Sequence, residues 1–384
     1  MVKIIRRYFS NFYKIFLILL FISFISIKLI YSQITPPESI KELLEKPWDT
    51  TSLNKAINML KNPEETEGNR YSALRLLTGN KRKMSKDELI LLLNEVTIIT
   101  KNPKESVRLS ALSISVISEI SLLLFEREEI SREEEIKEKE FLIDTAKNRS
   151  QDLLLRHNSI KAIDILKIKE AIPVLQEILR DSNNLNVPEI TRVSCFAFLH
   201  LAGDDSLPEI KNILYKTETP SIFSTAAYCL GQIKTDESIF SLVDNSERFT
   251  DTGACDFALV DMENVILEML EDPNNPNLIY AIKATKYLWK DGQREKYIPL
   301  LLNLLSNSSL ESRKIAIGRL RYEADLLPFD NQQKLLREIL SRIKEQPELE
   351  RYTKSINNQL KAEVLTPVKT DVKIPIKDEK SNND

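Results

Sequence analysis

Histidine, cysteine and glycine are scarce in this chain of 384 residues, which contains two, three and seven of them. The two histidines, His157 and His200, form no His-Glu-x-x-His pair, so the sequence offers no histidine-based metal site. The glycines form neither a phosphate-binding loop nor a nucleophile elbow. Cys195, Cys229 and Cys255 match no zinc or redox spacing, although an exported protein could oxidise two of them. We therefore predict no catalytic residue, no cofactor and no metal.

An excess of positive charge is also missing. The chain has 54 basic and 57 acidic residues, a net charge of −3. Removal of residues 1–32 would take away five basic and no acidic residues, which leaves 49 against 57 and a net charge of −8. A general nucleic-acid-binding protein is expected to carry a basic face and a high pI. The charge balance therefore argues against nucleic acid as a partner.

The N-terminus has an apolar run, but a short one. Four basic residues precede the run, which covers residues 15–27 and ends at Lys28. It is shorter than the ~20 residues that a helix needs to cross a bilayer. A basic region, an apolar core and Ser32 before a polar residue predict a signal peptide over residues 1–32; the alternative is an uncleaved anchor with a snorkelling Lys28. Either way we expect an exported protein of the periplasm or cell envelope, and the Lys-, Ile- and Asn-rich composition suggests a bacterium.

A short phrase recurs along the rest of the chain: an arginine, or a residue in its place, with a small residue three positions later. Its seven copies are Arg70/Ala73, Arg108/Ala111, Arg156/Ser159, Arg192/Cys195, Ser224/Ala227, Ala281/Ala284 and Arg313/Ala316. Each small residue lies in an apolar helical pattern, where it lets a neighbouring helix approach closely. A repeat at intervals of this size indicates one helix–turn–helix unit stacked many times.

A second helix with a repeated apolar pattern is predicted after several of these phrases. Pro173, Pro208 and Pro299 occupy one position near its start, and Asn264 fits the same position. The step from Pro208 to Asn264 is longer than the other steps. We interpret the extra chain as an inserted segment, residues 235–256.

The stretch Val107-Arg108-Leu109-Ser110-Ala111 resembles the valine–arginine–x–x–alanine phrase that opens first helices in the HEAT-repeat family. The resemblance covers roughly residues 50–345, and armadillo-type solenoids are the near relatives. It implies an all-α fold, a right-handed α-solenoid of about seven stacked HEAT-like units within residues 33–365. The fifth and sixth copies depart from the phrase because they lack the arginine.

Two further segments differ in composition from the repeats. Residues 126–140 are almost all charged, which predicts a solvated helix or loop; an acidic docking surface is the sharper alternative. Residues 366–384 combine two prolines with alternating lysine and aspartate, which predicts a disordered tail.

The resemblance also implies that second helices line the concave face of the stack. Polar residues that share one phase on these helices are the predicted partner-binding residues: Glu177, Arg180, Asn212, Tyr215, Glu268 and Asn303. The inserted segment 235–256 is a second candidate, because an irregular insertion in a repeat array often binds a ligand.

These features predict a non-enzymatic protein-interaction scaffold of the bacterial cell envelope, which binds a protein along the concave face. One alternative is an enzyme on a HEAT-like fold or a lyase-type protein, and another is a membrane-anchored spacer. The membrane is expected as a partner only through residues 1–32, if they are retained.

Overall fold

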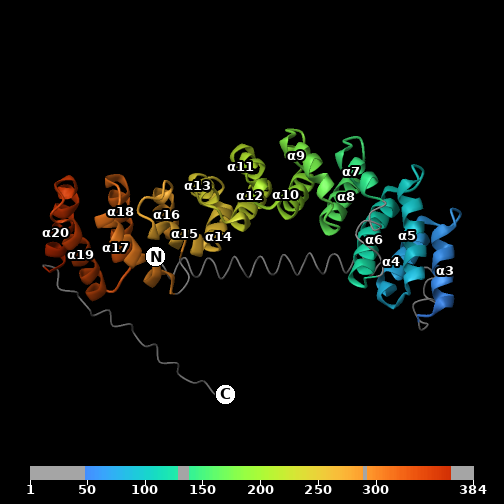
Figure 1. Ribbon diagram of the computed structural model, residues 1–384, viewed down its shortest axis with the longest axis horizontal. Coiled ribbons are helices and arrows are strands. Elements are labelled where there is room, and N and C mark those ends of the chain that lie inside the picture. The colour runs from blue at the N-terminus through green and yellow to red at the C-terminus, as the bar shows by residue number, and fades with distance from the viewer. Residues whose placement is uncertain (1–47, 129–137, 289–291, 365–384) are drawn as a thin grey trace, which may run out of the picture. The chain divides into compact units, whose positions relative to one another are not determined.

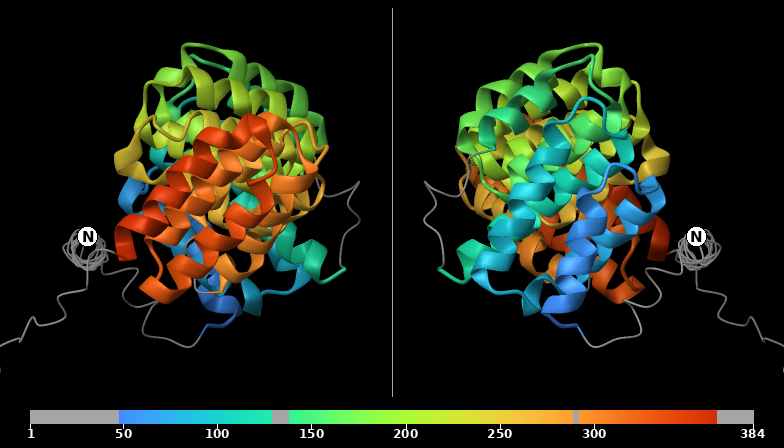
Figure 2. Two further views of the ribbon diagram at one scale, coloured as in Figure 1. Left: turned by 90° about the vertical axis from the view of Figure 1, so that its left-hand side faces the viewer. Right: turned by 90° about the vertical axis from the view of Figure 1, so that its right-hand side faces the viewer.

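The computed structural model describes residues 48–128, 138–288 and 292–364, and within these ranges all regular structure is helical (Figure 1). The predicted segments 1–32 and 366–384, and residues 129–137 of the charged segment, lie outside the described residues. The chain divides into two compact units, Met1–Ile168 and Lys169–Asp384, which are described separately. In Figure 2 the last helices of the second unit are red and the first helices of the first unit are blue.

Unit 1 consists of a series of helices. Its helices are α3 (Thr50–Lys61), α4 (Glu67–Asn80), α5 (Lys86–Lys101), α6 (Val107–Glu126), α7 (Lys139–Lys147) and α8 (Leu153–Ile165), with the short 3-10 helix η1 (Lys81–Lys83). Side-chain caps fix where several of them begin: Thr66, Ser85 and Ser106 each accept a hydrogen bond from a backbone N–H in the first turn. Ser85 and Glu88 complete a reciprocal capping box.

Unit 2 continues the same plan with more helices. They are α9 (Ile172–Arg180), α10 (Pro188–Ala202), α11 (Leu207–Lys216), α12 (Pro220–Ile233), α13 (Asp236–Asp244), α14 (Ala254–Val260), α15 (Glu263–Glu271), α16 (Leu278–Ala284), α17 (Gln293–Asn307), α18 (Leu310–Asp325), α19 (Phe329–Ile343) and α20 (Glu350–Val364). Short 3-10 helices join some of them: η2 (Lys169–Ala171), η3 (Asn184–Asn186), η4 (Gly203–Ser206), η5 (Thr250–Thr252), η6 (Thr285–Tyr287) and η7 (Pro347–Leu349).

The seven predicted first helices are all present, as α4, α6, α8, α10, α12, α16 and α18. The small residue of each phrase is buried, with at most 1% of its surface exposed. Successive helices pack on one another within each unit, for example α4 on α6 and α10 on α12. The prediction of an all-α solenoid of stacked helical pairs is thus confirmed.

Arginines of the phrase satisfy backbone groups at the end of the preceding helix. Arg70 Nε donates to the carbonyl oxygen of Leu60 at 2.9 Å, and Arg156 Nε donates to that of Ala146 at 3.2 Å. Both arginines are buried, and both reach a carbonyl ten residues earlier. The last carbonyls of a helix have no partner inside the helix, so a buried guanidinium in this place stabilises the junction between two helices.

The prediction that residues 235–256 are an irregular insertion is wrong. It contains all of α13 and the beginning of α14. The buried apolar residues Ile210 of α11, Ile239 of α13 and Ile266 of α15 hold one register, at steps of 29 and 27 residues. Two short repeats therefore fill the interval that we interpreted as one repeat with extra chain.

Arg248, in the loop between α13 and α14, explains why this region needs no arginine at Ser224. Its Nη1 donates to the carbonyl oxygen of Leu214 at 2.6 Å, and its Nη2 donates to that of Thr217 at 2.7 Å. Leu214 lies ten residues before Ser224, so Arg248 supplies from downstream the contact that the missing arginine would make. The loop therefore contributes to the structure of the scaffold through Arg248.

The second helices follow the prediction with one exception. Pro173 and Pro208 lie in the first turn of α9 and α11, where a proline N–H is not needed. Pro299 lies inside α17, which begins six residues earlier at Gln293. The polar stretch before Pro299 is therefore helical, and α17 is longer than its counterparts α9 and α11.

One helix in the described part of the chain, α6, is long and apolar enough to cross a membrane by length and composition. Of its most apolar window, 67% is buried inside the structure. Its residues Leu109, Ile117 and Leu124 pack in the core of unit 1. Its apolar character is explained by its position in that core.

Substitution of alanine for glycine is expected to change the free energy of unfolding in opposite directions at two helical positions. A Cβ at Gly231 of α12 would lie 3.0 Å from the Cβ of Ala258 in α14, whereas a Cβ at Gly318 of α18 would meet no atom within 4 Å. We expect Gly231→Ala to lower the free energy of unfolding by about 1–3 kcal/mol through overpacking. Gly318→Ala should raise it by about 0.5–1 kcal/mol through helix propensity. Chemical denaturation of both variants tests this, and equal shifts would contradict the close contact of α12 with α14.

Candidate partner-binding surfaces

The six residues predicted to bind a partner lie on four second helices of unit 2. Glu177 and Arg180 are on α9, Asn212 and Tyr215 on α11, Glu268 on α15 and Asn303 on α17. All of them are exposed except Asn212, which is half-buried. They are thus accessible, as expected for polar residues that share one phase on the second helices. Their role in binding stays a prediction.

Two of these residues also connect neighbouring second helices. Arg180 Nε donates to Glu209 Oε1 on α11 at 3.0 Å, and Gln176 Nε2 donates to the same oxygen at 2.6 Å. Glu209 is buried, so these bonds and the positive charge compensate for the desolvation of its carboxylate. Arg180 therefore contributes to the packing of α9 on α11 in addition to any contact with a partner.

The contacts continue from α11 to α13. Tyr215 donates a hydrogen bond from its hydroxyl to Asp244 Oδ2 at 2.9 Å, and Lys211 Nζ lies 2.5 Å from Glu237 Oε1. Partial burial and the acceptor Asp244 raise the pKa of Tyr215 to about 12, so the phenol stays protonated and continues to donate at neutral pH. Of the six predicted residues, Arg180 and Tyr215 thus cross-link neighbouring second helices.

A row of aromatic side chains on the first helices was not predicted. We call it the aromatic row: Phe196 on α10, Tyr228 on α12 and Phe257 on α14. Each of them directly precedes two buried residues, so the three have the same phase on their helices. Phe196 is half-buried, whereas Tyr228 is 51% and Phe257 58% exposed.

The aromatic row is held together by the packing of its helices. The rings of Phe196 and Tyr228 meet edge to face, with centroids 5.8 Å apart. Gly231 allows α12 to approach Ala258 of α14, the residue next to Phe257. The signal in the sequence was an aromatic residue directly after the small residue, Cys195-Phe196 and then Ala227-Tyr228, at the repeat spacing.

The cysteines are part of the core. Cys195, Cys229 and Cys255 are buried and free. Burial raises the pKa of all three thiols, for Cys229 and Cys255 to about 12. The described residues contain no group of three or more His, Cys, Asp or Glu side chains that could hold a metal ion.

Part of the charged segment 126–140 can be placed. Glu126 ends α6, and Lys139 begins α7. Between them, Glu138 lies 2.6 Å from Lys101 Nζ, which joins the end of α5 to the start of α7. The residues of this segment that the structure describes take part in helix ends within unit 1.

No protein-family model and no curated protein matches this chain. Solved structures similar to it include the complex of CpcE and CpcF of phycocyanin lyase from Nostoc sp. PCC7120, with 18% identity, 58% of this chain and 94% of that chain covered and a TM-score of 0.30. Another is Kap121p bound to Pho4p, with 12% identity, 83% of this chain and 42% of that chain covered and a TM-score of 0.36. At these TM-scores neither likeness adds to the fold that the chain's own helices establish.

The burial of the thiols predicts their reactivity. A thiolate is the nucleophile in alkylation, and thiols that are buried with a raised pKa form very little of it near pH 8. We expect iodoacetamide to leave Cys195, Cys229 and Cys255 unmodified in the native protein and to modify all three in guanidinium chloride. Intact-mass measurement distinguishes these states, and rapid native alkylation of any of them would contradict the assigned core.

Proposed function

We propose that this protein is a non-enzymatic interaction scaffold that binds a protein partner along side chains repeated on successive helices. The observation that carries the proposal is the aromatic row on α10, α12 and α14. Exposed aromatic side chains that lie in phase on neighbouring helices form an apolar strip, and such strips are typical of protein-binding surfaces. A stack of this kind presents an extended surface because each repeat adds one more residue to it.

The aromatic row is better suited to supply binding energy than the predicted row on the second helices. Large aromatic side chains dominate the energetics of interfaces when a partner covers them. Arg180 and Tyr215 already make contacts within the protein, and a partner would have to replace or extend those contacts. Glu268 and Asn303 are exposed polar positions on the second helices and offer a partner little apolar area.

The proposal places the protein in the bacterial cell envelope, exported through residues 1–32. This part rests on the sequence of that segment: basic residues followed by an apolar run too short to span a bilayer. Mass spectrometry of the N-terminus of the native protein tests it. A terminus at Gln33 supports cleavage after Ser32, and an intact segment in membranes supports an anchored form.

Site-specific crosslinking tests the proposed surface in the native setting. A photoreactive phenylalanine analogue placed at position 228 should capture a defined protein partner, because position 228 lies in the middle of the aromatic row. The same analogue at position 303, on α17, is the matched control on the second-helix surface. Capture from position 303 but not from position 228 would assign binding to the predicted row instead.

Truncation of side chains in the aromatic row should weaken binding of the partner without unfolding the protein. We expect Tyr228→Ala and Phe257→Ala each to lower the affinity for the captured partner by about 30-fold, the effect of losing ~2 kcal/mol at an interface hot spot. Both side chains are more than half exposed, so the melting temperature should change little.

Asn303→Ala is the control and should change the affinity less than about threefold under the same reasoning. Binding by titration calorimetry and melting by circular dichroism separate the two effects. Unchanged affinity in both aromatic variants would overturn the assignment of this surface, and turnover of a substrate by the purified protein would overturn the non-enzymatic function.

A further inference from the structure

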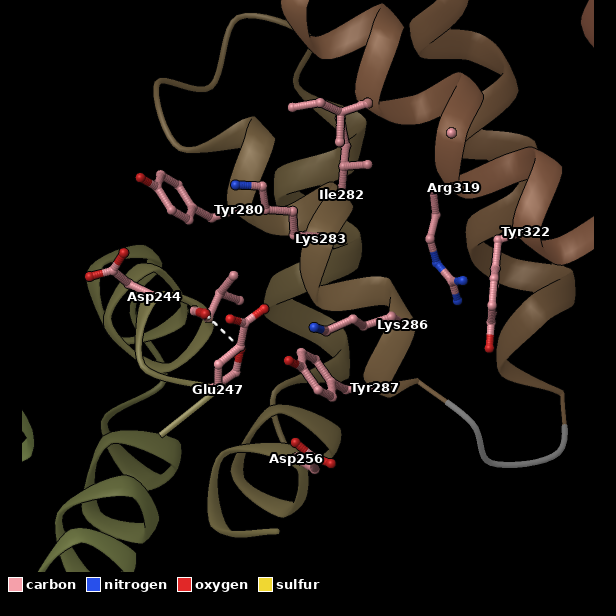
Figure 3. A pocket seen from close by; sticks show the side chains of 14 residues that line it. Asp244, Glu247, Asp256, Tyr280, Ile282, Lys283, Lys286, Tyr287, Arg319 and Tyr322 are labelled. Carbon is pink, nitrogen blue, oxygen red and sulfur yellow. Dashed lines mark hydrogen bonds between the residues drawn. The ribbon is translucent and has the colours of Figure 1, made fainter. Parts of the chain in front are cut away.

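A second feature of unit 2 lies apart from the aromatic row. It is a pocket of about 830 Å³ between the end of α13, α14, α16 with η6, and α18 (Figure 3). We call it the α16–α18 pocket. Its polar lining consists mainly of three acidic residues, three basic residues and three tyrosines: Asp244, Glu247, Asp256, Lys283, Lys286, Arg319, Tyr280, Tyr287 and Tyr322.

Two of the first helices that line the pocket are short. α14 and α16 have seven residues each, whereas α12 has 14 and α18 has 16. α16 packs beside α13, where the rings of Phe240 and Tyr280 meet edge to face at 4.4 Å. On the opposite side Gly318 of α18 is exposed, and no side chain fills the space above it.

The acidic and basic side chains come from different walls. Asp244 and Glu247 come from the end of α13 and the loop after it, and Asp256 comes from α14. The basic side chains come from α16, η6 and α18, and Figure 3 shows Arg319 beside Tyr322, away from Asp244 and Asp256. Burial raises the pKa of Asp256, while the charge of Lys286 acts in the opposite direction.

Each basic side chain of the pocket lies over the ring of a tyrosine. Lys283 Nζ is 5.4 Å from the ring centroid of Tyr280, and Lys286 Nζ is 4.6 Å from that of Tyr287. Such contacts hold a cation in place without neutralising it. The two ammonium groups therefore keep hydrogen-bond donors for another molecule.

Arg319 differs from the two lysines because the protein already uses its guanidinium. It donates to Thr285 Oγ1 at 2.9 Å and pairs with the buried carboxylate of Glu323. It also lies 5.0 Å from the ring centroid of Tyr322. Arg319 fixes the wall on which Tyr322 stands, and Lys283 and Lys286 are the basic groups that remain for binding.

Within the part of the chain that the structure describes, Glu247, Asp256, Lys283 and Lys286 form no ion pair with one another. Opposite charges thus line one concave site without neutralising each other by direct contact. A ligand that carries both signs would satisfy both walls, whereas a ligand of one sign would be repelled by one of them.

We propose that the α16–α18 pocket binds a linear peptide segment in which acidic and basic side chains alternate. The acidic side chains of the segment would face Lys283 and Lys286, and its basic side chains would face Glu247 and Asp256. The volume suits several residues of a peptide, since small-molecule sites of about 300–1,000 Å³ enclose drug-sized ligands. The tyrosines add apolar surface and hydroxyl groups for the peptide backbone.

This inference rests on the proposed function, in that the peptide belongs to a protein partner. The test uses the full chain and three fluorescein-labelled hexapeptides: three Glu-Lys repeats, six glutamates and six lysines. Fluorescence anisotropy should show at least about tenfold tighter binding of the alternating peptide than of either single-sign peptide. Raising the salt from about 50 to about 500 mM should weaken that binding. Equal binding of the three peptides, or none of the alternating one, would overturn the inference.

Substitutions at Gly318 locate the binding. Gly318→Phe places a ring in the open space of the pocket and should lower the affinity for the alternating peptide by at least about tenfold. Gly318→Ala is the matched control, since a methyl group leaves most of the pocket volume free. Its affinity for the alternating peptide should stay within about twofold of that of the unmodified protein. Equal binding by the two variants would place the peptide elsewhere.

Charge reversal on each wall gives a readout that a loss of folding cannot mimic. Lys283→Glu should shift the preference toward the lysine peptide, and Glu247→Lys should shift it toward the glutamate peptide. Absence of these opposite shifts would show that the peptides do not bind in the α16–α18 pocket. Crosslinking from position 228 reports on the proposed function separately: if it persists while the peptides fail, the scaffold stands and the pocket inference falls.

Discussion

The stack depends on satisfying the free carbonyl groups at the ends of its helices where they meet the next helix. The last backbone oxygens of a helix have no partner inside their own helix, and at two junctions the partner is an arginine of the next helix. Arg70 and Arg156 solve this in the same way, by donating from a buried guanidinium to a carbonyl ten residues earlier. In these two copies the arginine of the repeated phrase is therefore a structural residue, whereas Arg192 donates to Thr225 Oγ1 and Arg313 to Gln346 Oε1. The small residue three positions later is buried in every copy, where it allows a neighbouring helix to approach.

At Ser224, where the phrase lacks its arginine, another part of the chain supplies the contact. Arg248 reaches Leu214 and Thr217 from the loop between α13 and α14, and its guanidinium also lies 5.5 Å from the ring centroid of Phe223. This loop is thereby tied to the end of α11. The short repeats on either side of it leave α14 too short to cover its neighbours as α12 does. The α16–α18 pocket lies next to this short helix, and a Cβ at Gly318 in its lining would meet no atom within 4 Å.

Most of the fold could be predicted because local sequence patterns determine where its helices lie. The phrases marked the first helices correctly, and the buried small residues confirm the register of Ala111 and Ala227. The prediction failed between Thr235 and Asp256, where α14 carries no arginine phrase and the repeat length falls below 30 residues. The site was less predictable. The phase of a residue on its helix indicates whether it is exposed, but it does not reveal that Arg180 and Tyr215 bond to the next helix, since that depends on neighbours distant in sequence.

In unit 2 the second helices carry bonds between repeats, and the first helices carry exposed aromatic side chains. On the second helices, polar groups such as Arg180 and Glu209 connect α9 to α11, and Tyr215 and Asp244 connect α11 to α13. On the first helices, Tyr228 and Phe257 expose more than half of their surface and leave apolar area for a partner to cover. A partner that covers the aromatic row would gain this apolar burial without breaking the bonds between second helices. Under the proposed function, binding and stacking would be carried by different residues, so changes on the first helices would alter the partner while the scaffold persists.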